Sequence, residues 1–467
     1  MSTRILAGAF LASLIGSGWA RAQEPADIEK ITARIEALQR ELDELRSQVQ
    51  QIQRGAAPVA GAPGAPPAAG PAPAPTAVSP AIVQYETLSG DPYAAARIDN
   101  APIDPELKGF FAIPFTETRL RIGGYAKLDA IHDFKPIGDH DFFTTSTIPV
   151  EPGIWGDNTN IQARQTRLNI EMRRPTPAGM LRFYYENDFT GSYGPRVYNL
   201  RHAYGQLHNF LAGFTFSSMV DIDSTPDTLD FEGPGSTIFV FQPQVRYTHP
   251  ITKHHSIALS VEKGTSDIVT ETDVNQTITP TSPWPDGVFR WRYETDAGHL
   301  QVGVVLRSVG GYMGNIAEEH VFARGLSFSG NWLVVGSDNV QFQLNAGDGF
   351  GRYFSDISGL AADVGLDSDG KMVPLPAYGF FGGYQHYWRP AFRSTVTYGY
   401  LNVDSVDKTL TTDFHASHYA AANLIWHPKG SAFNMGIEGL YGKQTLKTGE
   451  SGDATRLQFA FQYDFVK

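Results

Sequence analysis

The chain has 467 residues with 37 Lys and Arg against 49 Asp and Glu, so its formal net charge is −12; this acidic balance argues against a nucleic-acid partner, which needs clustered basic surface. There is no Cys, which excludes disulfides, thiolate metal ligands and a Cys nucleophile. No run of 18 apolar residues occurs, so membrane-spanning helices are excluded, while the weaker alternating pattern of a membrane β-barrel stays open.

Residues 1–22 have the pattern of a secretory signal peptide. Arg4 provides the positive start, an apolar stretch follows, and Ala20-Arg21-Ala22 forms a cleavage site of the small-x-small type. The apolar stretch of about 11 residues is too short for a spanning helix, which needs about 20. We therefore expect export of the chain, with Gln23 as the mature N-terminus.

Residues 23–54 predict a short coiled-coil oligomerisation helix, because apolar residues recur there at alternating spacings of three and four. This seam consists of Ile28, Ile31, Ile35, Leu38, Leu42, Leu45, Val49 and Ile52. A lone amphipathic helix packed on a domain is the alternative, but the stripe is narrow for such packing. The mixture of Ile, Leu and Val does not choose between a dimer and a trimer.

Residues 55–118 form an Ala-, Pro- and Gly-rich linker and an irregular lead-in. Such composition cannot build a core and predicts an extended, semi-rigid spacer. The helix should therefore be tethered to the remainder of the chain rather than docked on it.

Residues 119–467 alternate between apolar and polar positions over segments of about 8 to 12 residues, long enough to cross a bilayer when tilted. One example is Phe289, Trp291 and Tyr293, which alternate with Arg290 and Arg292. A soluble β-sandwich or propeller is the alternative, but its strands would average about 5 to 6 residues. We predict an all-β fold, a transmembrane antiparallel β-barrel of about 16 strands, a size that keeps an aqueous lumen.

Several local motifs in this region resemble one known family. They are Gly123-Gly124-Tyr125-Ala126-Lys127-Leu128-Asp129, Asp141-Phe142-Phe143, Ala163-Arg164-Gln165-Thr166-Arg167-Leu168, Tyr185-Glu186-Asn187-Asp188-Phe189, Leu200-Arg201-His202-Ala203-Tyr204-Gly205 and Thr228-Leu229-Asp230-Phe231-Glu232-Gly233-Pro234. The sequence resembles the DcaP-like trimeric porins of Gram-negative outer membranes. The resemblance implies a homotrimer of sixteen-stranded channels in outer-membrane lipid, with the N-terminal helices in the periplasm, passing small anions such as dicarboxylates.

Arginines on the polar faces of the strands are the candidate functional residues. Guanidinium groups pair bidentately with carboxylates and stay charged, so a row of them in a lumen would guide small anions. The predicted lumen residues are Arg164, Arg167, Arg182, Arg201, Arg246, Arg290, Arg292 and Arg307. Both Arg164 and Arg167 can face inward only if a bulge lies between them. The alternative is that these arginines pair across the wall with Glu171, Glu186, Glu262, Glu294 or Glu438.

The sequence offers no catalytic motif, and we predict a protein that is not an enzyme and has no metal or cofactor. There is no Gly-x-Ser-x-Gly elbow or phosphate-binding loop. His415 with His418, and His254 with His255, lack a third ligand at a recognisable spacing. Two functions remain: an anion-preferring diffusion porin, and a structural or adhesive envelope protein with a barrel anchor and a periplasmic coiled coil.

Overall fold

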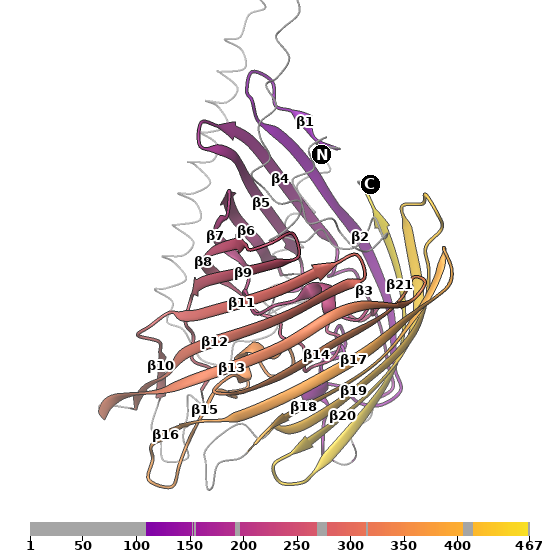
Figure 1. The fold of residues 1–467 in the computed structure, drawn as a ribbon. Coiled ribbons are helices and arrows are strands. Elements are labelled where there is room, and N and C mark those ends of the chain that lie inside the picture. Colours follow the sequence, from indigo (N-terminus) through magenta and orange to yellow (C-terminus); the bar gives the residue numbers. More distant parts are fainter. Residues whose placement is uncertain are drawn as a thin grey trace, which may run out of the picture. The chain divides into compact units, whose positions relative to one another are not determined.

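A computed structural model describes residues 109–465 except 152, 154–155, 192–196, 269–277, 314–315 and 405–413. These residues form a closed antiparallel β-barrel of 16 strands (Figure 1). Each wall strand pairs with its neighbour in the chain, and the last strand, β21, closes the barrel against the first, β2, from Tyr125↔Asp464 to Asp133↔Arg456. The predicted signal peptide, coiled-coil helix and most of the linker lie outside the described residues.

The sixteen wall strands are mostly 8 to 16 residues long. In chain order they are β2 (Arg119–Asp133), β4 (Arg167–Thr176), β5 (Gly179–Asp188), β6 (Asn199–Leu207), β7 (Phe210–Phe216), β8 (Phe241–Pro250), β9 (His255–Glu262), β11 (Asp286–Thr295), β12 (Gly298–Met313), β13 (Ile316–Val335), β14 (Asp338–Asp348), β17 (Pro376–Arg389), β18 (Phe392–Val403), β19 (Phe414–Trp426), β20 (Phe433–Leu446) and β21 (Ser451–Asp464).

Shorter elements complete the fold. They are β1 (Phe111–Ala112), β3 (Asn158–Gln162), β10 (Ile278–Thr281), the hairpin β15 (Val364–Leu366) and β16 (Met372–Pro374), and three 3₁₀ turns, η1 (Thr145–Thr147), η2 (Ile222–Ser224) and η3 (Gly351–Tyr353). Two of them, β15 and β16, form a separate two-stranded sheet. Strands β3 and β4 pair with successive parts of β2, and the interruption between them contains Arg164. No helix in the described part of the chain is long and apolar enough to span a membrane.

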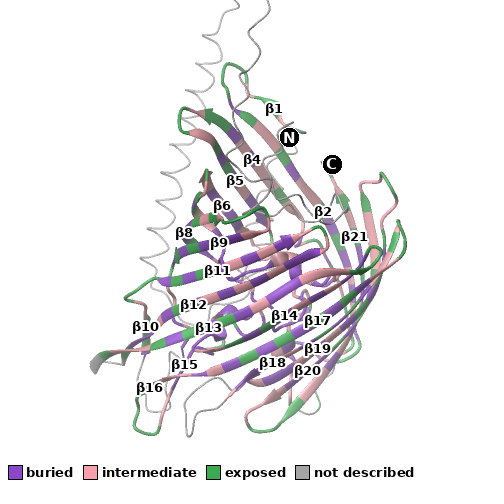
Figure 2. Cartoon of the chain, in the orientation of Figure 1, coloured by how far each residue is buried: buried purple, intermediate pink, exposed green. Residues whose placement is uncertain are grey.

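Side chains alternate between the two faces of the wall, as the sequence pattern predicts. In β11, Arg290 and Arg292 are buried while Phe289 is 38% exposed; in β17, Phe381 is buried and Phe380 exposed. Figure 2 shows this alternation as bands along the strands. The apolar outer face and closed sheet exclude the sandwich alternative, because a sandwich buries its apolar face between two sheets.

The two ends of the barrel differ. At one end, called the turn end, short turns join β4 to β5, β6 to β7 and β8 to β9. At the other, the loop end, three long connections bury apolar residues inside the barrel: 134–157, 217–240 and 349–375. Phe350, Phe354 and Ile238 are fully buried in one cluster. These loops therefore pack their apolar side chains against one another and against the inner face of the wall.

Candidate functional site

Residues 217–240, between β7 and β8, cross the barrel interior and are called the lumen loop. The wall holds the loop by its backbone. The N–H groups of Leu229 and Asp230 donate to the Glu438 carboxylate at 3.0 and 2.8 Å, and the amide of Asn423 donates to Asp227 O at 2.7 Å. Further along, the Asn345 amide donates to a loop carbonyl. Inward-facing polar residues of distant strands thus satisfy the loop's backbone groups, which would otherwise be buried unpaired.

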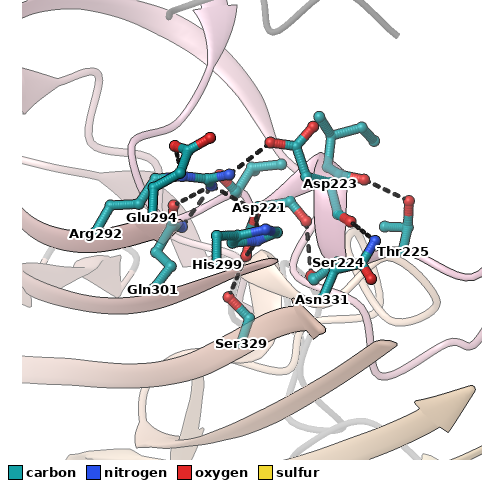
Figure 3. A network of polar contacts seen from close by, with 12 residues as sticks. Asp221, Asp223, Ser224, Thr225, Arg292, Glu294, His299, Gln301, Ser329 and Asn331 are labelled. Atoms are coloured by element: carbon teal, nitrogen blue, oxygen red, sulfur yellow. Dashed lines mark hydrogen bonds and ion pairs between the residues drawn. The ribbon is translucent and has the colours of Figure 1, made fainter. Parts of the chain in front are cut away.

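The start of the lumen loop is fixed by an ion-pair network around Asp221 (Figure 3). Arg292 of β11 donates to Asp221 at 2.9 Å and to Asp223 at 2.7 Å. His299 Nε2 lies 2.9 Å from Asp221, and the Ser329 hydroxyl donates to Asp221 at 2.6 Å. Burial alone would raise the pKa of Asp221, but His299 and Arg292 outweigh it and hold that pKa well below its usual range.

Asp221, Asp223 and His299 also bring three possible metal-ligand atoms within 4.8 Å of one another. The guanidinium of Arg292 already bridges the two carboxylates, so the positive charge that a metal ion would supply is present in the protein itself. The arrangement is that of an anchor for the loop.

A cavity of about 230 Å³ remains between the lumen loop and the wall formed by β2 and β21. Its charged lining residues are Lys127, Asp230 and Glu232, and aromatic rings including Phe231 line it as well. None of the eight predicted arginines is among the residues that line this cavity.

Glu171 of β4 pairs with three arginines. Its carboxylate pairs with Arg173 at 2.7 Å, Arg182 at 2.7 Å and Arg121 at 2.8 Å. The side chain of Arg121 is 32% exposed, whereas Glu171 is 1% exposed. The Phe110 ring lies 5.2 Å from the Arg121 guanidinium and 5.1 Å from that of Arg173. Arg121 was missed by the sequence reasoning, although its alternation with Leu120 and Ile122 was a usable signal.

A second cluster joins Arg167 and Arg201 to the carboxylates of Glu186 and Asp188. Arg201 contacts them at 3.0 and 3.1 Å, and Arg167 at 3.4 and 3.8 Å. The Arg201 guanidinium also lies 5.5 Å from the centre of the Phe231 ring, which connects this wall cluster to the lumen loop.

The other predicted arginines occupy separate places. Arg164 lies between β3 and β4 and pairs with Asp141. Arg307 pairs with Asp286 at 3.1 Å and Asp363 at 3.0 Å. Arg246 and Arg290 are buried in β8 and β11.

Wall pairing, the alternative raised from the sequence, is seen for Glu171, Glu186 and Glu294. Glu262 instead accepts from Ser218 N and from the Gln242 amide, and Glu438 holds the lumen loop. Most of the arginine charge is therefore balanced locally.

The family model of the DcaP outer membrane protein matches residues 111–465. The fold is similar to the crystal structure of the outer membrane channel DcaP of Acinetobacter baumannii, with a TM-score of 0.66 and 21% identity over 76% of this chain and 99% of that one. An anion-selective porin from Comamonas acidovorans matches with a TM-score of 0.48 and 9% identity, over 75% of this chain and all of that one. No curated protein sequence matches.

Proposed function

Because the chain belongs to the DcaP outer membrane protein family, we propose that it is a porin for the passive diffusion of small, preferentially anionic solutes, with dicarboxylates favoured. The barrel provides the wall of such a channel, and its apolar outer face suits contact with outer-membrane lipid.

The cluster around Glu171 carries the anionic preference. Three guanidinium groups surround one carboxylate, which gathers cationic side chains of β2, β4 and β5 on the inner face of the wall. Arg121 is its accessible member, and a guanidinium binds a carboxylate through two parallel hydrogen bonds. A dicarboxylate passing along β2 and β4 would replace its bound water with hydrogen bonds from this guanidinium group.

We extend the proposal to assembly and orientation. Outer-membrane barrels place short turns in the periplasm and long loops outside, which puts the turn end and the start of β2 on the periplasmic side. The seam of residues 23–54 would then join three copies in the periplasm. The homotrimer rests on the family resemblance and on the heptad spacing of that seam.

Solute flux into liposomes tests the proposal. Proteoliposomes containing the full mature chain should swell faster in succinate than in a diamine of similar size. Arg121→Gln should lower the succinate rate, while Arg324→Gln is the matched control because Arg324 is 68% exposed and pairs with Asp348 at the loop end. Equal rates for succinate and the diamine would refute the anionic preference. Absence of any solute flux would refute the porin and favour the structural envelope role.

A further inference from the structure

The charged groups that line the cavity beneath the lumen loop differ in how fully they are paired. Lys127 donates to Gln165 and to Leu229 O and lies 3.3 Å from Asp129. Asp230 accepts from the backbone N–H groups of Phe143 and Gly233, both at 3.0 Å. These two groups are thus committed to holding the loops in place.

Glu232, the third charged lining residue, lies where three loops meet. Ser355 of connection 349–375 donates to its carboxyl group, and Asp356 of the same connection acts on it electrostatically. Asp230 of the lumen loop and Asp139 of connection 134–157 also act on Glu232, and all three carboxyl groups disfavour its ionised form. A new negative charge at Glu232 therefore meets three existing carboxyl groups.

The surroundings of Glu232 include titratable and charged groups from every neighbouring element. Asp139 in connection 134–157, Asp230 in the lumen loop and Asp356 in connection 349–375 act on Glu232 itself, and Tyr419 on β19 interacts with it. Lys127 and Tyr125 on β2 line the same cavity, while Arg456 on β21 acts on Asp230 and Glu438 on β20 acts on Tyr419. Burial, followed by Asp356 and Asp230, raises the pKa of Glu232 to about 8. Burial also raises the pKa of Asp230.

We propose that Glu232 is a specificity-determining residue whose protonation sets whether anions enter the cavity. The proposal rests on the proposed anion-porin function and adds a dependence of anion entry on pH. With Glu232 protonated, the cavity carries no charge at its Glu232 edge, and the Lys127–Asp129 pair lies across from it. With Glu232 ionised, a negative charge stands at the same edge, among carboxyl groups, and repels an entering dicarboxylate. The paired wall arginines cannot offset this change, because their charge stays fixed while Glu232 titrates.

The sign of the pH dependence follows from a raised acid pKa. Below the usual Glu range the residue is protonated in every state, and it stays protonated in the folded protein up to the raised value. Anion permeability should therefore be high at pH 6 and should fall as the pH rises through about 8. The fall should be about fivefold, as expected for one charge added to the lining of the cavity.

Reversal potentials of the full chain in a planar bilayer, measured in a KCl gradient from pH 5.5 to 9.5, test the proposal. The Glu232→Gln channel should show, at every pH, the anion selectivity that the unsubstituted channel shows at low pH. Glu450→Gln is the matched control and should titrate like the unsubstituted protein, because Glu450 is exposed in the β20–β21 turn and bonded to Thr448. Ser355→Ala removes a donor to the ionised carboxylate and should move the midpoint to higher pH, which keeps a test available if the Gln variant fails to fold.

Each outcome separates the two proposals. A conducting channel with a pH-independent reversal potential, or a Glu232→Gln channel that still titrates, overturns the role of Glu232 and leaves the porin intact. Absence of conductance in the unsubstituted protein overturns the porin itself.

Discussion

Asp221 anchors the lumen loop, and its replacement by Asn removes the charge while keeping the shape. Asp221 is fully buried and contacts Arg292, His299 and Ser329. Removing one partner of a buried ion pair lowers the stability by about 3 to 5 kcal/mol when the remaining charge has no other partner. Arg292 keeps Asp223 at 2.7 Å and Glu294 at 3.3 Å, so we expect a smaller cost of about 2 kcal/mol, which is about a 25-fold increase in local opening of the loop.

Limited proteolysis of the lumen loop and single-channel current noise measure this opening. Asp221→Asn should be cleaved within residues 217–240 about 25-fold faster and should show flickering conductance, while the heat stability of the barrel stays the same because the strand ladders are intact. Asp348→Asn is the matched control, since its pair with Arg324 is exposed and such pairs contribute about 0 to 1 kcal/mol. Identical cleavage rates for both variants would show that the Asp221 network does not hold the loop.

Three further changes test other parts of the structure. Glu171→Gln leaves three guanidinium groups without their shared carboxylate and should lower the free energy of unfolding by about 3 kcal/mol, measured by denaturation in detergent micelles. Gly325→Ala should destabilise connection 349–375, because a Cβ there would lie 2.3 Å from the Phe350 ring; overpacking of this kind costs about 1 to 3 kcal/mol, and faster proteolysis of that connection would show it. Deleting residues 23–54 should leave a conducting barrel that dissociates into monomers more readily, as size-exclusion chromatography would show; loss of insertion would mean that the barrel depends on the helix.

The strands of the barrel wall, and the face on which each side chain lies, could be predicted because both follow from the alternation of apolar and polar residues. Each strand has an apolar outer face and a polar inner face, so Phe289 and Arg290 could be assigned to opposite sides from sequence alone, and the structure confirms the sixteen-stranded barrel. Between β3 and β4 the pairing with β2 shifts by one residue, from Asp129↔Gln162 to Tyr125↔Arg167, and this is the kind of irregularity that was expected between Arg164 and Arg167.

The interior was not predictable in the same way. The lumen loop is held by Glu438 and Asn423, which are about 200 residues away in sequence and reach the loop only once the barrel closes. The pKa of Glu232 is raised because the folded loops bury its carboxyl group and connection 349–375 brings Asp356 beside it. Sequence periodicity tells which face a side chain occupies, but the partner across the lumen depends on register, barrel closure and loop path.

Single-channel recording of the purified full-length protein in a planar bilayer with a KCl gradient tests the central claim most directly. The structure predicts discrete conductance steps and a reversal potential of the sign given by anion flow at pH 6. Steps with cation selectivity would contradict the role of the Glu171 cluster, and a protein that inserts without conducting would contradict the porin assignment.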